Sequence, residues 1–160
     1  MAKIEHTYLF QPGLWQVEGV YFDGKGVRHR QTGQLVVVHG PGLWTIDSTV
    51  NISGEDTRDF QTLYEVTPPA EGLSYAEWKS ASTGPEPIYG LFVVVDDVIM
   101  MPWQSRTGSY WGQEMLARVS DSEYLNRGFA FLKSTMVHSW SVRLSGAGGP
   151  GGSAVKSDFD

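Results

Sequence analysis

The stretch that decides the fold runs from Ser109 to Leu144 and reads SYWGQEMLARVSDSEYLNRGFAFLKSTMVHSWSVRL. It divides into three segments of alternating apolar and polar residues, joined by two short polar turns. A period of two residues is typical of a half-buried β-strand, because successive side chains point to opposite faces of a sheet. Short turns join antiparallel neighbours. The stretch therefore predicts three consecutive strands of an antiparallel meander.

The chain before this stretch repeats the same pattern from Gly13 onward. Its alternating segments end at turn-forming residues, and they recur at roughly the 8–12 residue spacing expected of a sandwich or barrel. No segment shows the apolar stripe of a convincing helix. Closing such a meander on itself removes its unpaired edges. We therefore predict an all-β, single-domain, up-and-down antiparallel barrel of about eight to ten strands over residues 1–145. Residues 146–160, rich in glycine, are predicted to be a flexible tail.

Three local features add detail to this prediction. The apolar residues Tyr8–Phe10 are expected to fold over one end of the core. Gly33 is a candidate break in the strand expected over residues 27–39. Pro102 lacks a backbone N–H, so the strand that contains it is expected to end early or to lie at a rim.

Composition excludes several classes of function. The formal net charge of −6 disfavours binding of nucleic acid through bulk electrostatics. The chain contains no cysteine, which excludes disulfides and thiolate chemistry. Residues 1–13 lack the apolar core of a secretory signal, and no run approaches the ~20 apolar residues of a membrane helix. A soluble, cytoplasmic protein with no membrane partner is the expectation.

One short motif is typical of a different class of protein, the RNA-binding domains. Arg127–Leu132 (RGFAFL) matches the RNP1 signature of RNA-recognition domains. Such a domain needs a helix after that strand, whereas Ser134–Leu144 alternates as a strand does. The segment is therefore interpreted as a barrel strand.

A second motif carries a resemblance to a known family. Gly13-Leu14-Trp15 on the first predicted strand resembles the Gly-x-Trp signature of the calycins, which include lipocalins and fatty-acid-binding proteins. The resemblance implies that Trp15 plugs the closed end of a barrel and that Arg143, on the last strand, packs across it. It also implies a small apolar or amphipathic ligand.

The chain departs from the best-known calycins in two places. Only Asp23–Gly26 stands where fatty-acid-binding proteins insert a helical lid, and the C-terminal helix of lipocalins is missing. A lidless barrel is closer to the nitrobindin branch, in which a histidine near the C-terminus binds haem. His138 is similarly placed, so the resemblance implies haem as a candidate cofactor.

Strand parity suggests which side chains line the interior. His138, Trp140, Val142 and Leu144 share one face of the last strand, and this face is predicted to point inward. The first hypothesis is a binding cavity for a small hydrophobic or amphipathic molecule. The residues predicted to hold this ligand are Trp44, Tyr64, Trp78, Trp111, His138 and Trp140.

Two further hypotheses use the same cavity. A cofactor-free enzyme of isomerase, cyclase or hydratase type would use Glu114, Tyr110 and His138 for acid–base chemistry, provided that Glu114 points inward. A haem protein would use His138 as the axial ligand. Apart from that haem ligand no metal site is predicted, because the histidines are scattered and no metal-binding motif occurs.

Exposed aromatic residues on a strand would also allow two barrels to pair as a homodimer. The sequence leaves the ligand's identity open, because specificity depends on the shape of the cavity.

Overall fold

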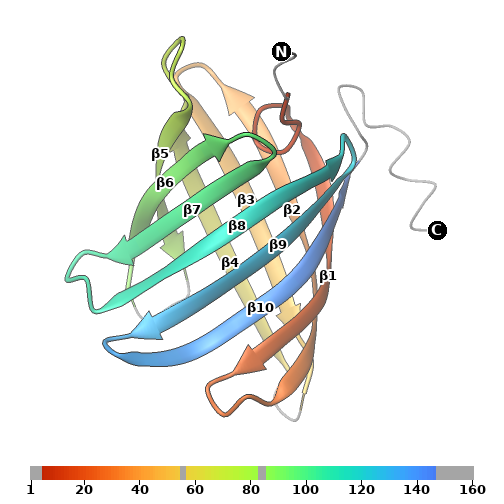
Figure 1. Cartoon of the computed structure of the whole chain (residues 1–160), viewed down its shortest axis with the longest axis vertical. Coiled ribbons are helices and arrows are strands. Elements are labelled where there is room, and N and C mark those ends of the chain that lie inside the picture. Colours follow the sequence, from red (N-terminus) through yellow and green to blue (C-terminus); the bar gives the residue numbers. More distant parts are fainter. Residues whose placement is uncertain (1–4, 55–56, 83–85, 147–160) are drawn as a thin grey trace.

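The alternating segments form ten antiparallel strands in the computed structural model, which describes residues 5–54, 57–82 and 86–146. No helix able to cross a membrane is present in these residues. Each strand pairs with its neighbours in sequence, and β1 pairs with β10, which closes the barrel (Figure 1). The predicted all-β, up-and-down barrel is therefore confirmed. The strands are β1 (Gly13–Asp23), β2 (Arg28–Gly40), β3 (Leu43–Ile52), β4 (Arg58–Thr67), β5 (Tyr75–Ser82), β6 (Ile88–Val95), β7 (Val98–Ser105), β8 (Tyr110–Ser120), β9 (Glu123–Leu132) and β10 (Thr135–Gly146).

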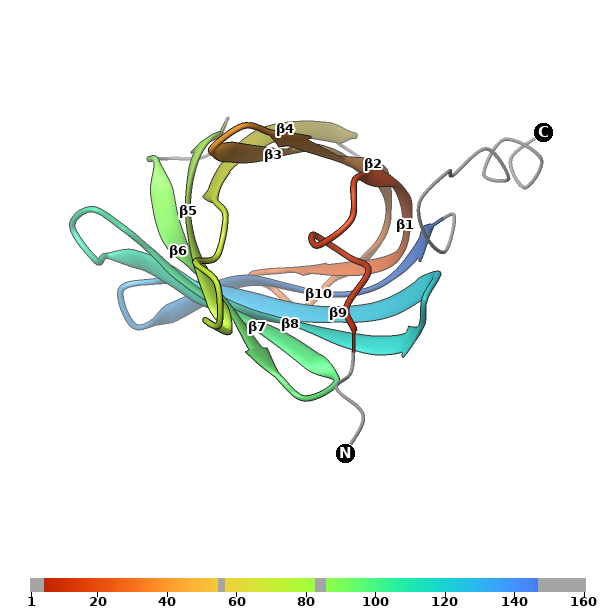
Figure 2. The ribbon, with the colours of Figure 1, turned by 90° about the horizontal axis from the view of Figure 1, so that it is seen from above.

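The seam between β1 and β10 completes the ring of strands seen in Figure 2. Its register runs from Trp15 opposite Gly146 to Asp23 opposite His138. The predicted boundary of the tail is therefore corrected by one residue, because Gly146 is the last residue of a paired strand. The rest of the predicted tail lies outside the described residues.

The N-terminal segment before β1 closes one end of the barrel, as Figure 2 shows. Tyr8 and Leu9 are 4% and 0% exposed, which agrees with the prediction that this apolar patch covers the core. Tyr8 packs edge-on against Trp15, with ring centroids 5.7 Å apart. His39 Nε2 donates a hydrogen bond of 2.7 Å to the carbonyl oxygen of Leu9. Apolar burial and a partly buried hydrogen bond thus hold this end closed.

A second anchor of this segment is His6. Its Nε2 lies 2.8 Å from the carbonyl oxygen of Asp96, and its Nδ1 lies 2.7 Å from Tyr124 Oη. Because a carbonyl can only accept, Nε2 is the donor to Asp96. Tyr124 itself is 0% exposed. The N-terminal segment is therefore tied to β9 and to the turn after β6.

Three glycines on the inner wall each make room for a tryptophan. A Cβ atom on Gly146 would lie 2.7 Å from the indole of Trp15. The corresponding distances are 2.3 Å from Gly112 to Trp103 and 2.2 Å from Gly128 to Trp140. The indoles therefore lie against bare backbone, which a side chain at these positions would prevent.

Two expectations about strand breaks are corrected. β2 runs through Gly33 without interruption, and a Cβ there would lie only 2.1 Å from the carbonyl oxygen of Thr49. Close approach of the neighbouring strand, rather than a break, explains this glycine. β7 continues past Pro102 to Ser105, and only its ladder to β6 is interrupted, between the pairs Gly90–Trp103 and Val93–Met100. The missing N–H of Pro102 accounts for that gap.

The proposed end-plug role of Arg143 is wrong. Its side chain is 61% exposed and forms an ion pair of 3.1 Å with Glu123 on the outer face. The reason is parity: Leu144, its neighbour, points into the core with 1% exposure, so Arg143 must point out. Trp15, in contrast, is 4% exposed and lies at the closed end between Tyr8 and Tyr124.

Candidate ligand-binding site

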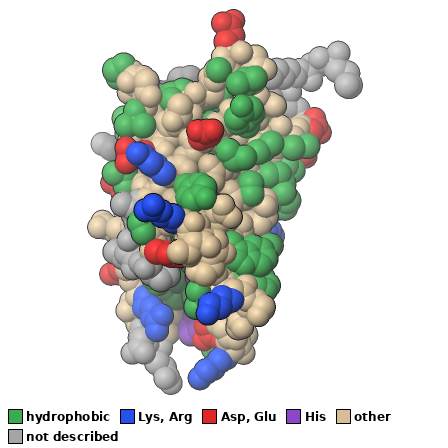
Figure 3. All heavy atoms as spheres, turned by 90° about the vertical axis from the view of Figure 1, so that its left-hand side faces the viewer, with side chains coloured by type: hydrophobic (Ala, Val, Ile, Leu, Met, Phe, Trp, Pro, Cys, Tyr) green, Lys and Arg blue, Asp and Glu red, His purple; other side chains and the backbone are tan. Residues whose placement is uncertain are grey.

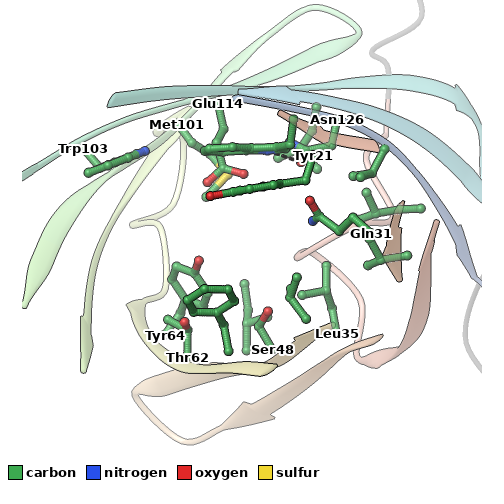
Figure 4. A pocket seen from close by; sticks show the side chains of 18 of the residues that line it. Tyr21, Gln31, Leu35, Ser48, Thr62, Tyr64, Met101, Trp103, Glu114 and Asn126 are labelled. Carbon is green, nitrogen blue, oxygen red and sulfur yellow. Dashed lines mark hydrogen bonds between the residues drawn. The ribbon is translucent and has the colours of Figure 1, made fainter. Parts of the chain in front are cut away.

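The barrel encloses a cavity of about 350 Å³ between the N-terminal segment and the opposite end. This volume lies near the lower end of the roughly 300–1,000 Å³ range of small-molecule pockets. The exposed residue Arg58, at the start of β4, lines the end opposite the N-terminal segment, which we call the mouth. Figure 4 shows side chains from two facing walls pointing into the space. Its polar and ionisable lining residues are Tyr8, Tyr21, Gln31, Ser48, Arg58, Thr62, Tyr64, Tyr110, Glu114, Asn126, His138 and Trp140.

Glu114 carries the acidic group of this cavity. It lies on β8 and pairs with Met101 of β7 and Gly128 of β9. Figure 4 shows its carboxyl group pointing into the space on the same wall as Met101 and Asn126. Glu114 is partly buried and lines the cavity. The question that the sequence left open is thus settled: Glu114 points inward.

Burial changes the acidity of this carboxyl group. It raises the pKa of Glu114 from 4.5 to about 7, because the charged form loses its hydration. The Asn126 amide and the Trp140 N–H lie close enough to favour the carboxylate, and they lower the pKa in part. Asn126 is itself held in place, since its Oδ1 accepts a 2.9 Å hydrogen bond from Trp140 Nε1 and its Nδ2 donates to Met115 O at 3.1 Å.

An aromatic group surrounds His138 nearer to the mouth. Its Nε2 lies 3.5 Å from Tyr110 Oη, and its ring centroid is 5.4 Å from that of Tyr21 and 5.7 Å from that of Trp140. Desolvation lowers the pKa of His138 to about 4, so the imidazole is neutral at pH 7. Burial also raises the pKa of Tyr110 to about 12. The side chains that line this end of the cavity are therefore uncharged at neutral pH, apart from exposed Arg58.

The facing wall carries small polar groups. Figure 4 shows Ser48, Thr62 and Tyr64 opposite Glu114, with Gln31 between the two walls. Gln31 and Ser48 are 8% and 5% exposed. Burial raises the pKa of Tyr64 well above its ordinary value, so it stays a neutral hydrogen-bonding group. The cavity thus combines apolar surface with separate hydrogen-bonding groups, as sites for amphipathic ligands do.

Five of the predicted site residues meet in this cavity: Tyr64, Tyr110, Glu114, His138 and Trp140. Two others point inward without lining it. Trp44 stacks on His39 at 3.9 Å near the closed end, and Trp78 is buried, with its N–H bonded to Leu91 O. Among the residues that sequence reasoning missed are Trp103 and the polar or hydroxyl-bearing residues Tyr21, Gln31, Ser48, Thr62 and Asn126. Strand parity could have identified the polar residues among them, because each lies on the same strand face as residues of the buried core.

The prediction that Trp111 holds a ligand in the cavity is wrong. Trp111 is 38% exposed and stacks on Phe131 on the outer face, with ring centroids 4.8 Å apart. Glu114 occupies the inward parity of β8, so Trp111 must point out. Other apolar side chains, such as Tyr75 and Tyr89, are also exposed. Figure 3 shows that hydrophobic side chains on one side of the barrel are interspersed with charged ones.

The arrangement around His138 does not fit a haem ligand. Its Nε2 already faces the Tyr110 hydroxyl, and the rings of Tyr21, Tyr110 and Trp140 lie within 6.4 Å of the imidazole centroid. A flat macrocycle needs open space beside the ligating nitrogen. Among the described residues, no group of three or more His, Asp or Glu side chains could hold a metal ion.

Comparison with known proteins adds one likeness. No protein-family model and no curated protein matches this chain. Among solved structures, EF1p2_mFAP2b bound to DFHBI superposes with a TM-score of 0.50 and 14% sequence identity. The match covers 88% of this chain and 96% of that chain. At this identity the likeness concerns the barrel fold alone.

Proposed function

We propose that this protein binds a small amphipathic molecule inside its barrel. The observation that carries the proposal is a cavity of about 350 Å³ whose walls combine aromatic surface with a few converging polar groups. A barrel core with no binding role would be expected to fill this space with side chains, because protein interiors are close-packed. Instead, small residues such as Ser48 and Thr62 face the space. The structurally similar EF1p2_mFAP2b, solved bound to DFHBI, supports a barrel that holds a small molecule.

Within the same proposal, the barrel is of the calycin type. Trp15 at the closed end, with the N-terminal segment packed over it, supports this assignment. The position of Arg143 does not, because it lies on the outer face. The ligand-binding proposal depends on the cavity and stands whichever barrel family the chain belongs to.

The test uses the neutral fluorophore N-phenyl-1-naphthylamine, whose emission rises in apolar surroundings. We expect saturable binding of one molecule per barrel. Replacing Thr62 by tryptophan should abolish this binding, because the indole would project into the cavity. Leu63→Trp is the matched control, since Leu63 is the adjacent residue on the outer face, 44% exposed. Equal binding by both variants would show that the fluorophore sits outside the barrel, and the proposal would fail.

A second candidate function is acid–base catalysis on the bound molecule. It is favoured by a carboxyl group with a pKa of about 7 in the same cavity as a neutral imidazole. The deprotonated Glu114 would remove a proton from the carbon next to a carbonyl and leave an enolate. The Glu114 carboxyl group would exchange that proton for a deuteron of the solvent, and transfer of the deuteron to the same carbon would restore the ketone and the carboxylate. With 2-tetralone in deuterated buffer at pH 8, mass spectrometry should show faster deuterium uptake with the protein than without it. Equal deuterium uptake with the wild type and with Glu114→Gln would exclude this catalytic function. The proposal of ligand binding would not be affected by that result.

A further inference from the structure

We propose that the ligand of this cavity carries a basic nitrogen, which binds as a cation to the Glu114 carboxylate between Trp103 and Trp140. The inference rests on the proposed function, because it names the chemical class of the molecule held in the cavity. It is carried by two independent observations, the lack of a counter-ion for Glu114 and the placement of the two indoles beside it.

The first observation concerns charge. The ion pairs found among the described residues are His29–Asp23, Arg30–Glu18, Arg118–Asp121 and Arg143–Glu123. None of them includes Glu114, although it is the acidic residue lining the cavity. A carboxylate taken out of water is costly unless an opposite charge accompanies it. Arg58 does not fill this role, because it is exposed at the mouth and Glu114 lies deeper on β8. A cationic ligand would supply the missing partner.

The second observation concerns the wall around the carboxylate. Gly112 precedes Glu114 by two residues on the same face of β8, and Gly128 is its partner on β9. Trp103 lies against Gly112, and Trp140 lies against Gly128. The bare backbone at these glycines therefore lets two indoles lie against the wall on either side of Glu114. An indole face attracts a cation, most strongly where water is excluded.

Other ligand classes fit this wall less well. An anion placed near Glu114 would meet like charge, and a purely apolar molecule would leave the carboxylate desolvated with no counter-ion. The titratable groups whose pKa the Glu114 charge helps to raise are three tyrosines, Tyr8 in the N-terminal segment, Tyr64 and Tyr110. Burial raises the pKa of each, so all three are neutral at pH 8 and offer hydrogen bonds rather than charge. His138, nearer the mouth, is also neutral there.

The test compares three molecules that share an indole and differ in charge: tryptamine, a cation; tryptophol, its neutral alcohol counterpart; and indole-3-acetate, an anion. Binding is measured by isothermal titration calorimetry at pH 8, where Glu114 is ionised. We expect tryptamine to bind at least about tenfold more tightly than tryptophol, since a charge-assisted hydrogen bond is roughly twice as strong as a neutral one. Glu114→Gln should remove this preference, so that tryptamine and tryptophol bind to the variant with similar affinity.

Glu77→Gln is the matched control, because Glu77 lies exposed on the outer face of β5 and should keep the preference. Equal binding of tryptamine and tryptophol by the wild-type protein, or tightest binding of indole-3-acetate, would overturn the inference without recourse to any variant. If N-phenyl-1-naphthylamine enters the cavity but tryptamine does not bind, the inference is wrong and the proposed function stands. If neither binds, both fail.

Discussion

Replacing Glu114 by glutamine is expected to stabilise the barrel at pH 8 and to leave its stability almost unchanged near pH 4. The carboxyl group has an ordinary pKa of 4.5 when it is exposed in the unfolded chain, and burial raises this to about 7 in the folded protein. As the pH rises above about 4.5, the unfolded chain loses this proton while the folded protein keeps it. Folding then becomes less favourable, until the folded protein also ionises near pH 7.

The size of this effect follows from the difference in pKa. One pKa unit corresponds to about 1.4 kcal/mol, so the change from 4.5 to about 7 lowers the free energy of unfolding by about 3 kcal/mol above pH 7. Glutamine has nearly the same shape and carries no charge, so it escapes this penalty. Its amide can also hydrogen bond to Asn126. The difference between the two proteins should therefore grow between about pH 4.5 and pH 7 and then stay constant.

Urea unfolding of wild type and Glu114→Gln at several pH values between 4 and 8.5 measures this difference directly. The titration of His138 acts on both proteins and therefore cancels when one free energy is subtracted from the other. Glu77→Gln, on the outer face, should track the wild type throughout. The reasoning is refuted if Glu114→Gln is no more stable than wild type at pH 8, or if the difference between them does not change with pH.

Three other substitutions test separate parts of the structure. The pKa of His138 is lowered from 6.5 to about 4, so its titration should cost the folded protein up to about 3 kcal/mol as the pH falls through this range. The titration of Glu114 acts on both proteins, so urea unfolding should show His138→Phe gaining up to about 3 kcal/mol relative to the wild type between pH 6.5 and pH 4. Gly128→Ala should cost about 1–3 kcal/mol, because its Cβ would meet the Trp140 indole, whereas Gly13→Ala, with nothing within 4 Å, should be nearly neutral in thermal unfolding. Arg143→Ala should cost less than about 1 kcal/mol in chemical unfolding, as an exposed ion pair predicts; a loss of several kcal/mol would revive the end-plug role.

Most of the fold could be predicted from the sequence, because the pattern that specifies it is local. Alternation with a period of two residues marks each strand and sets the face on which each side chain lies, and short turns make sequence neighbours pair. Two local exceptions to this pattern, at Pro102 and Gly33, are explained only by the tertiary structure. Pro102 sits inside β7 because the ladder to β6 skips it, and Gly33 sits inside β2 because a neighbouring carbonyl approaches closely.

The candidate site was harder to predict, and the errors have two different causes. The resemblance predicts an end-plug role for Arg143, whereas its strand parity, opposite to that of Leu144, places its side chain on the outer face. For β8 the parity left two sets of residues, and nothing local decided whether Glu114 or Trp111 faced the interior. Aromatic character favoured Trp111, but the outer face holds it in a cluster with Phe129 and Phe131.

The sequence by itself determined the strands, their order and the set of side chains that share each face, because these depend on neighbouring residues. It also held the signal for Tyr110, Glu114 and His138 as chemical candidates. Only the closed barrel decided that these three share one cavity, that Glu114 lies between Trp103 and Trp140, and that no other described side chain balances its charge. Such relations depend on the register of strands far apart in the chain, which alternation along one strand cannot specify.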